Sequence, residues 1–328
     1  MDAARRAVEV RDLTKRFGAT LALDRLTLSI ESGEIFGLVG PDGAGKTTSL
    51  RLLAGVMGAT SGSALILGTD VTHNPEPVRH RIGYVPQSSS LYADLTAREN
   101  LRFYADLFGM RRAERERRAE ELLGFSRLAP FAGRLTRNLS GGMRQKLALC
   151  VALIHQPEIL FLDEPTIGVD PVSRRDFWLL VVQLVRQGLT VLVTTPYLDE
   201  AERCHRVALL DHGRLIACDT PAQLRRLLPG TLLEVRGAAP EALAPMLRVQ
   251  AEVEDVQLFG DALHVRVSQA AASPRLQAAL VTAGFPGAAL RPIQPGLEDV
   301  FVALLKDKRS AISTQQSAEG PDRPEVNG

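Results

Sequence analysis

Nine consecutive residues near the N-terminus have the types and spacing needed to hold a chain of phosphate groups. They read Gly40-Pro41-Asp42-Gly43-Ala44-Gly45-Lys46-Thr47-Thr48 and match the pattern G-x-x-x-x-G-K-[ST]. The glycines permit a tight turn that points backbone N–H groups at phosphate oxygens. Lys46 would reach the β- and γ-phosphates, and the Thr47 hydroxyl would hold Mg²⁺. The pattern therefore predicts a nucleoside triphosphate site. The alternative interpretation is a glycine-rich turn with an exposed lysine.

Two adjacent carboxylates follow a short apolar segment in residues 159–164, ILFLDE. We expect the apolar residues to form a buried strand, which places Asp163 and Glu164 at its end. Asp163 would hold Mg²⁺, through water, and Glu164 would act as general base on the attacking water. The alternative is a strand that ends in an acidic turn.

A second candidate phosphate site lies at residues 139–145, LSGGMRQ, directly before the helical run KLALCVALI. Ser140, Gly141 and Gly142 would form a backbone cradle at the N-terminus of that helix. LSGGMRQ, lying between the phosphate loop and a DEPT tract, resembles the signature of ATP-binding cassette (ABC) ATPases. The resemblance covers about residues 8–225.

This resemblance implies ATP and Mg²⁺ as cofactors and a second cassette as partner. The two cassettes would close head to tail, so that each signature faces the γ-phosphate bound by the other. Phe17 would stack on adenine, Gln87 would contact Mg²⁺ and signal to the membrane partner, and Asp170 would couple the two sites. The competing interpretations are a core residue for Phe17, a surface-loop amide for Gln87 and a helix N-cap for Asp170.

One position departs from the family pattern. The family has a histidine after the strand that ends here in Thr194-Thr195, and this chain has Pro196 there. That histidine binds the γ-phosphate, whereas proline has neither a side-chain donor nor a backbone N–H. Tyr197 points in a different direction and is a weak substitute, and we expect His205 on the next helix. We therefore expect ATP binding to survive and hydrolysis at this site to be slow.

The pattern of apolar residues predicts the elements that position these groups. Residues 8–30 alternate between apolar and polar residues in two stretches and read as antiparallel strands. Residues 34–40, 158–162 and 190–195 read as buried strands of a parallel sheet, and residues 47–56 read as a helix. The predicted fold class is therefore an α/β P-loop NTPase cassette with a parallel core sheet, an antiparallel β subdomain and a helical subdomain.

The chain is expected to contain two domains and a tail. The ATPase domain would span residues 1–227, with a helical insert at about 88–155 in which the charged run 111–121 forms a solvated helix face. A small α+β domain would span residues 228–308. Residues 309–328 lack apolar periodicity, and their composition predicts disorder.

Composition restricts where the protein can act. There are 39 basic and 38 acidic side chains, a net charge of +1, so no nucleic-acid partner is expected. Cys150, Cys204 and Cys218 are too few and too scattered for a disulfide framework, and a reducing cytoplasm fits them best. No apolar run is long enough to cross a membrane. Any membrane role would therefore run through a partner, at the cytoplasmic face of the cell membrane.

The end of the cassette resembles a particular group of transporters. Residues 295–301, PGLEDVF, and the tract EPTIGVDPVSRRDFW resemble multidrug and antibiotic exporters. That group implies export of a drug, antibiotic or lipid-like compound through a separate membrane permease, with a periplasmic adaptor as an additional option. Two alternatives stay open: a non-transport ABC factor acting on ribosomes or DNA, and a nucleotide-binding regulatory subunit with little turnover. A homodimer and a heterodimer are equally compatible with the sequence.

Pro196 generates the first prediction. Pro196→His should raise steady-state ATPase activity with the native partners present, because one lost hydrogen bond to developing charge costs on the order of 10²–10³ in rate. Equal rates for the two proteins would show that the proline does not slow hydrolysis.

Overall fold

The computed structural model describes residues 6–88 and 90–306, and the chain divides into two compact units, Met1–Pro221 and Ala222–Gly328. The sequence prediction puts the boundary slightly later, after residue 227. The expected disorder of residues 309–328 concerns residues outside the described part of the chain.

The first unit contains an antiparallel sheet and a larger core sheet. The antiparallel sheet consists, in spatial order, of β2 (Thr20–Glu31), β1 (Arg6–Phe17), β4 (Ser61–Ile66) and β5 (Thr69–Asp70). The core sheet consists of β10 (Arg214–Asp219), β9 (Arg206–Asp211), β3 (Ile35–Val39), β8 (Thr190–Thr195), β7 (Ile159–Asp163) and β6 (Ile82–Val85). Strands β9 to β6 pair in parallel, and β10 pairs antiparallel with β9.

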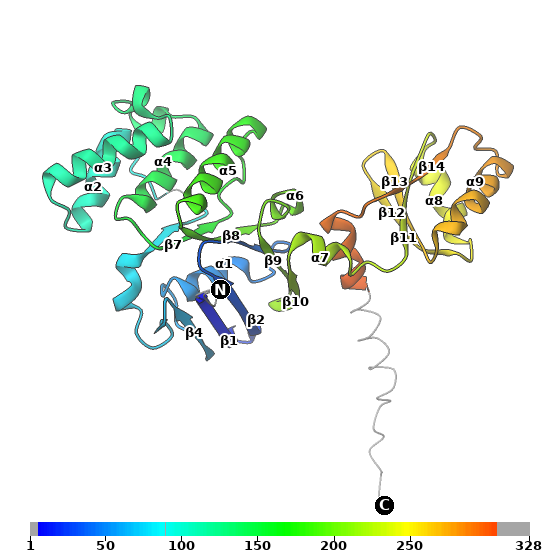
Figure 1. Cartoon of the computed structure of the whole chain (residues 1–328), viewed down its shortest axis with the longest axis horizontal. Coiled ribbons are helices and arrows are strands. Elements are labelled where there is room, and N and C mark those ends of the chain that lie inside the picture. Colours follow the sequence, from blue (N-terminus) through cyan, green and yellow to red (C-terminus); the bar gives the residue numbers. More distant parts are fainter. Residues whose placement is uncertain (1–5, 89, 307–328) are drawn as a thin grey trace, which may run out of the picture. The chain divides into compact units, whose positions relative to one another are not determined.

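Burial explains why these short segments form the core sheet. Every residue of β3, β7 and β8 is buried, so strands of this kind are covered on both faces. Helix α1 (Lys46–Leu53) lies between the two sheets (Figure 1), and its leucines join one apolar core with residues from both. The predicted helix at 47–56 therefore ends three residues early, at Leu53.

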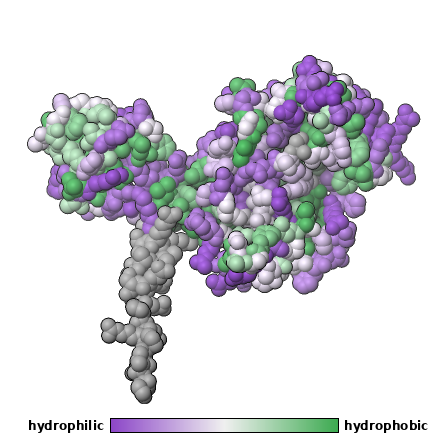
Figure 2. Space-filling model, turned by 180° about the vertical axis from the view of Figure 1, so that it is seen from behind, coloured by the Kyte–Doolittle hydropathy of each residue, from purple (hydrophilic) through white to green (hydrophobic). Residues whose placement is uncertain are grey.

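Helices cover the other side of the core sheet (Figure 1). They are α2 (Ala97–Leu107), α3 (Arg112–Phe125), α4 (Gly141–Leu153) and α5 (Pro171–Arg186), and the short α6 (Leu198–Ala201) follows β8. A capping box of Thr96 and Glu99 begins α2. The charged run in α3 is a solvated face, since only Ala119, Leu122 and Leu123 of that helix are buried. Hydrophilic residues cover much of the face shown in Figure 2, where hydrophobic residues form separate small patches.

The second unit is the expected small α+β domain. After α7 (Pro221–Arg225), its elements are β11 (Thr231–Arg236), α8 (Pro240–Arg248), β12 (Val253–Phe259), β13 (Ala262–Val267), α9 (Ser273–Thr282) and β14 (Ala289–Ile293), and residues 297–306 are helical. The antiparallel strand order β12-β13-β11-β14 is that of a ferredoxin-like β-α-β-β-α-β unit. The predicted fold class is confirmed.

A buried glutamate joins two strands of this unit. Glu234 on β11 is 7% exposed, and its Oε2 lies 2.9 Å from Arg236 Nε and 2.7 Å from Arg291 Nε on β14. Hydrogen bonds from Arg236 and Arg291 lower the pKa of Glu234 from 4.5 to about 2. A lowered pKa in the folded state stabilises the fold at pH values above the unfolded-state pKa.

This pair of arginines predicts a pH dependence for the second unit. Its free energy of unfolding should fall as pH decreases from about 4.5 to about 2, because Glu234 takes up a proton more readily when unfolded. Amide hydrogen exchange of β11 in the full chain, corrected for intrinsic rates at each pH, measures this. Glu234→Gln should flatten the dependence in that window, and an unchanged slope would contradict the assignment.

Candidate nucleotide-binding site

The phosphate loop connects the end of β3 to the start of α1, and its glycines are required by close backbone contacts. A Cβ on Gly40 would lie 2.2 Å from the carbonyl oxygen of Leu210. Gly45 has φ +97°, and a Cβ there would lie 2.7 Å from the carbonyl oxygen of Ala22. Both distances are far below van der Waals contact, so only glycine permits this loop path.

Lys46 is buried with its charge directed at the loop and at Glu164. Its side chain donates hydrogen bonds to the carbonyl oxygens of Gly40 (2.8 Å) and Pro41 (2.9 Å). Its Nζ lies 3.0 Å from Glu164 Oε1, and Lys46 and Glu164 are 4% and 6% exposed. This excludes the alternative of an exposed lysine on a glycine-rich turn. It also places the ammonium group beside the carboxylate expected to act as base.

Asp163 is fully buried at the end of β7 and accepts hydrogen bonds from three hydroxyls. Thr47 and Thr194 each donate to Oδ1 at 2.9 Å, and Tyr84 donates to Oδ2 at 3.2 Å. Burial and the negative charge of Asp163 raise the pKa of Tyr84 to about 12. Tyr84 and Thr194 were missed by sequence reasoning. Tyr84 lies three residues before Gln87, and Thr194 lies near the end of an apolar strand. These positions are what the sequence offers to identify the two residues.

Glu164 lies in a turn that aims its side chain into the site. Its φ is +48°, an uncommon value for a residue other than glycine, and its N–H donates to Thr194 Oγ1 at 2.9 Å. Gln87 Nε2 donates to Glu164 Oε2 at 2.7 Å. Gln87 lies in an exposed loop, as its surface-loop alternative has it, but its amide bonds to Glu164, so Lys46 and Gln87 hold the two oxygens of that carboxylate. Contact of Gln87 with Mg²⁺ stays a prediction.

Lys46, Thr47, Gln87 and Glu164 all line one cavity of about 580 Å³, within the usual range for a small-molecule site. The cavity is lined by Ala22, Asp42, Gly43, Gly45, Lys46, Thr47, Thr48, Gln87, Glu164 and Ile167. A lysine, backbone amides and a helix N-terminus suit a polyphosphate. The Thr47 hydroxyl and the Asp163 carboxylate are oxygen donors of the kind Mg²⁺ prefers. The residues present therefore fit both ATP and Mg²⁺.

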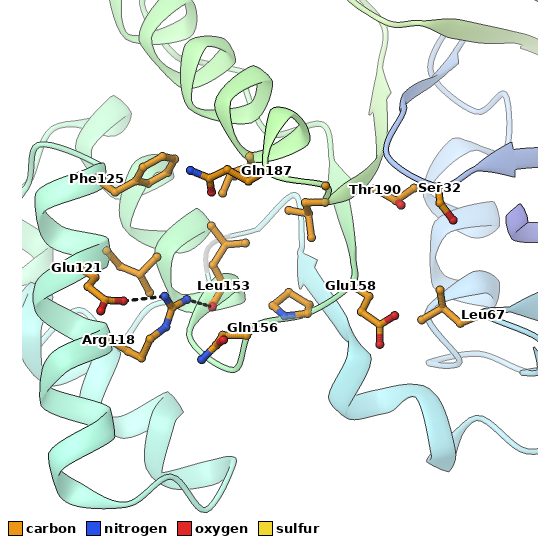
Figure 3. Close-up of a pocket in the computed structure, with 15 residues that line it drawn as sticks. Ser32, Leu67, Arg118, Glu121, Phe125, Leu153, Gln156, Glu158, Gln187 and Thr190 are labelled. Carbon is orange, nitrogen blue, oxygen red and sulfur yellow. Dashed lines mark hydrogen bonds and ion pairs between the residues drawn. The ribbon is translucent and has the colours of Figure 1, made fainter. Parts of the chain in front are cut away.

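A second cavity of about 640 Å³ lies at the opposite edge of the core sheet (Figure 3). Its lining includes Glu158 and Thr190, which precede or begin their strands, whereas the phosphate loop follows the end of β3. One charged side chain of this cavity is paired within the molecule: Arg118 donates to Glu121 at 2.9 Å and to the carbonyl oxygen of Leu153 at 3.2 Å. Although it is the larger cavity, we place the chemistry in the smaller one.

The predicted signature lies at the start of α4. Ser140 is the N-cap of α4 and accepts from Met143 N at 3.3 Å. Gly142 is buried against α5, where a Cβ would lie 2.3 Å from Ser173 Oγ. Gly141 lines a separate cavity of about 200 Å³. The signature thus lies outside the cavity of the chain's own phosphate loop. A head-to-tail pair of cassettes requires this separation.

Phe17 and Asp170 have clear local settings. Phe17, at the end of β1, is 48% exposed, which excludes the core alternative and leaves its ring available for stacking. Asp170 is the N-cap of α5 and accepts from Ser173 N at 2.9 Å, a hydrogen bond that lowers its pKa. Asp170 is therefore a helix N-cap, as its alternative interpretation has it. Its coupling role across a dimer stays a prediction, and so does the stacking of Phe17 on adenine.

Tyr197 and His205, the two side chains considered as substitutes for the family histidine, are both engaged elsewhere. The Tyr197 ring lies under Arg174, whose Cζ is 4.5 Å from the ring centroid. The expectation that His205 lies on a helix is wrong: it directly precedes β9, and its Nδ1 accepts from Ile35 N at 2.9 Å. Ile35 begins β3, so His205 lies at the sheet edge away from the phosphate loop.

Comparisons with known proteins agree with this site. The family model described as ABC transporter matches residues 23–167. The chain is 37% identical over 319 residues to the daunorubicin/doxorubicin resistance ATP-binding protein DrrA of Streptomyces peucetius, covering 96% of this chain and 97% of that protein. The chain therefore belongs to the family of ABC transporter ATP-binding proteins, which are ATPases, and the resemblance read from the sequence is confirmed.

Two further relatives extend the comparison. The probable multidrug ABC transporter ATP-binding protein YbhF of Escherichia coli is 46% identical over 221 residues, 66% of this chain, but the chain spans only 38% of its length. A solved dimeric post-hydrolysis state of the ATP-binding cassette MJ0796, bound to ADP and Pi, is 29% identical with a TM-score of 0.60. That match covers 65% of this chain and 98% of the other.

The packing of Gly142 predicts a difference between the two signature glycines. Gly142→Ala should destabilise the first unit by about 1–3 kcal/mol, because its Cβ would overlap Ser173. Gly141→Ala is the matched control, since among the described residues no heavy atom lies within 4 Å of its Cβ position. Urea unfolding followed by fluorescence of Trp178 measures both, and equal loss in both variants would contradict this packing.

Proposed function

We propose that this chain is the ATP-binding subunit of an exporter, and that it hydrolyses Mg-ATP to drive transport through separate membrane subunits. The observation that carries the proposal is the buried contact of Lys46 with Glu164 in a cavity that Thr47 and Gln87 also line, with Asp163 bonded to Thr47. The printed names of YbhF and DrrA, multidrug transport and daunorubicin/doxorubicin resistance, support export of a drug, antibiotic or lipid-like compound.

The residues suggest how the reaction proceeds. The loop amides and Lys46 hold the β- and γ-phosphates, and the γ-phosphate takes the position beside Lys46 that Glu164 now shares. Glu164, oriented by Gln87, accepts a proton from the attacking water. Thr47, Asp163 and Gln87 would hold Mg²⁺, which would supply positive charge against the phosphate oxygens. Phosphoryl transfer is to water.

Pro196 favours slow turnover at this site. Its ring nitrogen carries no hydrogen, and the nearby Tyr197 N–H donates to Thr195 Oγ1 at 3.0 Å. A γ-phosphate here therefore lacks the donor that the family histidine supplies. This observation also supports the second candidate function, a regulatory subunit that binds nucleotide and turns over little.

A single chain supplies only part of a cassette pair, so the proposed function requires partners. Gly141 of the signature lines a different cavity from that of the chain's own phosphate loop, so a second cassette, identical or not, completes each site. Among the helices of the described residues, none has the length and apolar character to span a bilayer. The names of the relatives support a membrane permease that anchors the chain at the cytoplasmic face of the cell membrane, with a periplasmic adaptor as a further partner. The ribosome- or DNA-acting alternative is not favoured by the relatives.

Removing the Lys46 ammonium tests the nucleotide site. Lys46→Ala should weaken Mg-ATP binding at least about tenfold, since a hydrogen bond to a charged group contributes about 1.5–3 kcal/mol. Lys146→Ala, which removes a lysine bonded to Asp176 at 2.8 Å, is the control and should retain affinity. Calorimetric titration with Mg-ATP measures both. If Lys46→Ala left affinity and transport untouched, the assignment of this site would be wrong.

Copurification from detergent extracts tests the partner. A membrane permease that copurifies with the chain and transports on addition of ATP supports the exporter. Ribosomes or DNA in its place would support the non-transport factor instead.

A further inference from the structure

A fully buried carboxylate lies beside the proposed site but outside its cavity. Glu200, on α6, is 0% exposed. Its Oε1 accepts from Thr166 Oγ1 at 2.6 Å, and its Oε2 accepts from Thr195 Oγ1 at 2.8 Å. Both threonines are 1% exposed. Burial of an ionised carboxylate costs free energy unless hydrogen bonds or an opposite charge compensate it.

The nearest positive charge to this carboxylate belongs to α5. Arg174 Nε lies 3.5 Å from Glu200 Oε1, and this nitrogen is buried without a hydrogen bond to any described residue. The guanidinium also stacks on the Tyr197 ring and lies 3.9 Å from Asp199. The Arg174 N–H donates to the carbonyl oxygen of Asp170 at 2.9 Å, within the first turn of α5. Arg174 therefore contacts Glu200, Asp199 and Tyr197 together and lies in the first turn of α5.

The members of this cluster belong to three segments that border the proposed reaction site. Thr166 follows the general base Glu164 by two residues. Thr195 lies between Thr194, which bonds to Asp163, and Pro196. Arg174 lies on the helix that Asp170 caps. One side chain, Glu200, therefore contacts all three segments.

The Glu200 carboxylate fixes which atoms donate and which accept in its hydrogen bonds with the two threonines. An ionised carboxylate only accepts, so both threonine hydroxyls must donate to it. The Thr195 oxygen is then left to accept, and it accepts from Tyr197 N at 3.0 Å. Glu200 thus determines the hydroxyl orientation that closes the turn around Pro196.

We propose that Glu200 is a positioning residue for ATP hydrolysis, which holds the Glu164 turn, the Pro196 loop and the first turn of α5 as one unit. The inference rests on the proposed function, because it presumes that Glu164 acts on water. The cluster contacts neither Lys46 nor Thr47 within the described part of the chain, so its loss should affect the rate and spare nucleotide affinity. Movement at Asp170 on cassette pairing would reach Glu164 through Arg174, Glu200 and Thr166.

Thr195 allows a test that keeps the fold. Thr195→Val preserves shape and removes the hydroxyl, and Thr195→Ser restores it. In the full chain with its permease, Thr195→Val should lower kcat about 10–100-fold, the scale expected for a misplaced catalytic group, with Mg-ATP affinity unchanged. Thr195→Ser should recover most of the rate, and Glu200→Gln should lower kcat without changing affinity.

Thr190 provides the matched control on the same strand. It is 3% exposed and its hydroxyl accepts from Gly33 N at 3.0 Å, at the far end of β8. Thr190→Val should destabilise the protein to a similar extent and leave kcat unchanged. If Thr195→Val and Thr190→Val lower kcat equally, or Thr195→Ser fails to rescue, the positioning role is overturned while the exporter proposal stands. If the unsubstituted chain shows no turnover with its permease, the proposed function fails and this inference fails with it.

Discussion

The arrangement of the site depends on one buried contact between opposite charges. Lys46 and Glu164 are almost completely withdrawn from water, and a charge in that setting is stable only beside a partner. The two residues come from different strand ends, and they meet because β3 and β7 both run parallel to β8, which lies between them. The loops that follow such strands gather at one edge of the sheet. The glycines of the phosphate loop then let the backbone approach closely enough for contact.

The same contact explains why the site is ready for a triphosphate. Lys46 satisfies its charge with Glu164 and with loop carbonyl oxygens, and each of these contacts occupies space at the phosphate loop. In the proposed reaction, a γ-phosphate would replace one anionic partner of the lysine by another. Gln87 donates a hydrogen bond to Glu164, so both oxygens of this carboxylate have a partner. The lysine of the phosphate loop and the proposed base are therefore linked by direct contact.

A surrounding set of hydroxyl groups holds the acidic residues of this site. Three hydroxyls converge on Asp163, and two more converge on Glu200. Such donors satisfy buried carboxylates without adding charge, which leaves the positive potential of the site to Lys46 and the helix N-terminus. Pro196 directly follows Thr194 and Thr195, which contribute one hydroxyl to each of these two groups of bonds. Hydrogen bonds hold the Pro196 loop in place, although Pro196 itself has no hydrogen-bond donor. In this chain, the conformation of the loop therefore does not depend on a donor to phosphate at position 196.

Segments that are continuous along the chain could be predicted from the residues alone. They are the phosphate loop, the strand with its paired carboxylates, the capped signature helix and the alternating strands of the antiparallel sheet. Their spacing is local, and local spacing sets turn and strand geometry. The contacts of Thr47, Tyr84 and Thr166 with their carboxylates span 116, 79 and 34 residues, and no local pattern encodes them. The exposure of Phe17 and the placement of His205 at the far edge of the sheet were likewise decided by tertiary structure. Strand order determines which distant residues share an edge, and that order results from packing of the whole sheet rather than from any one segment.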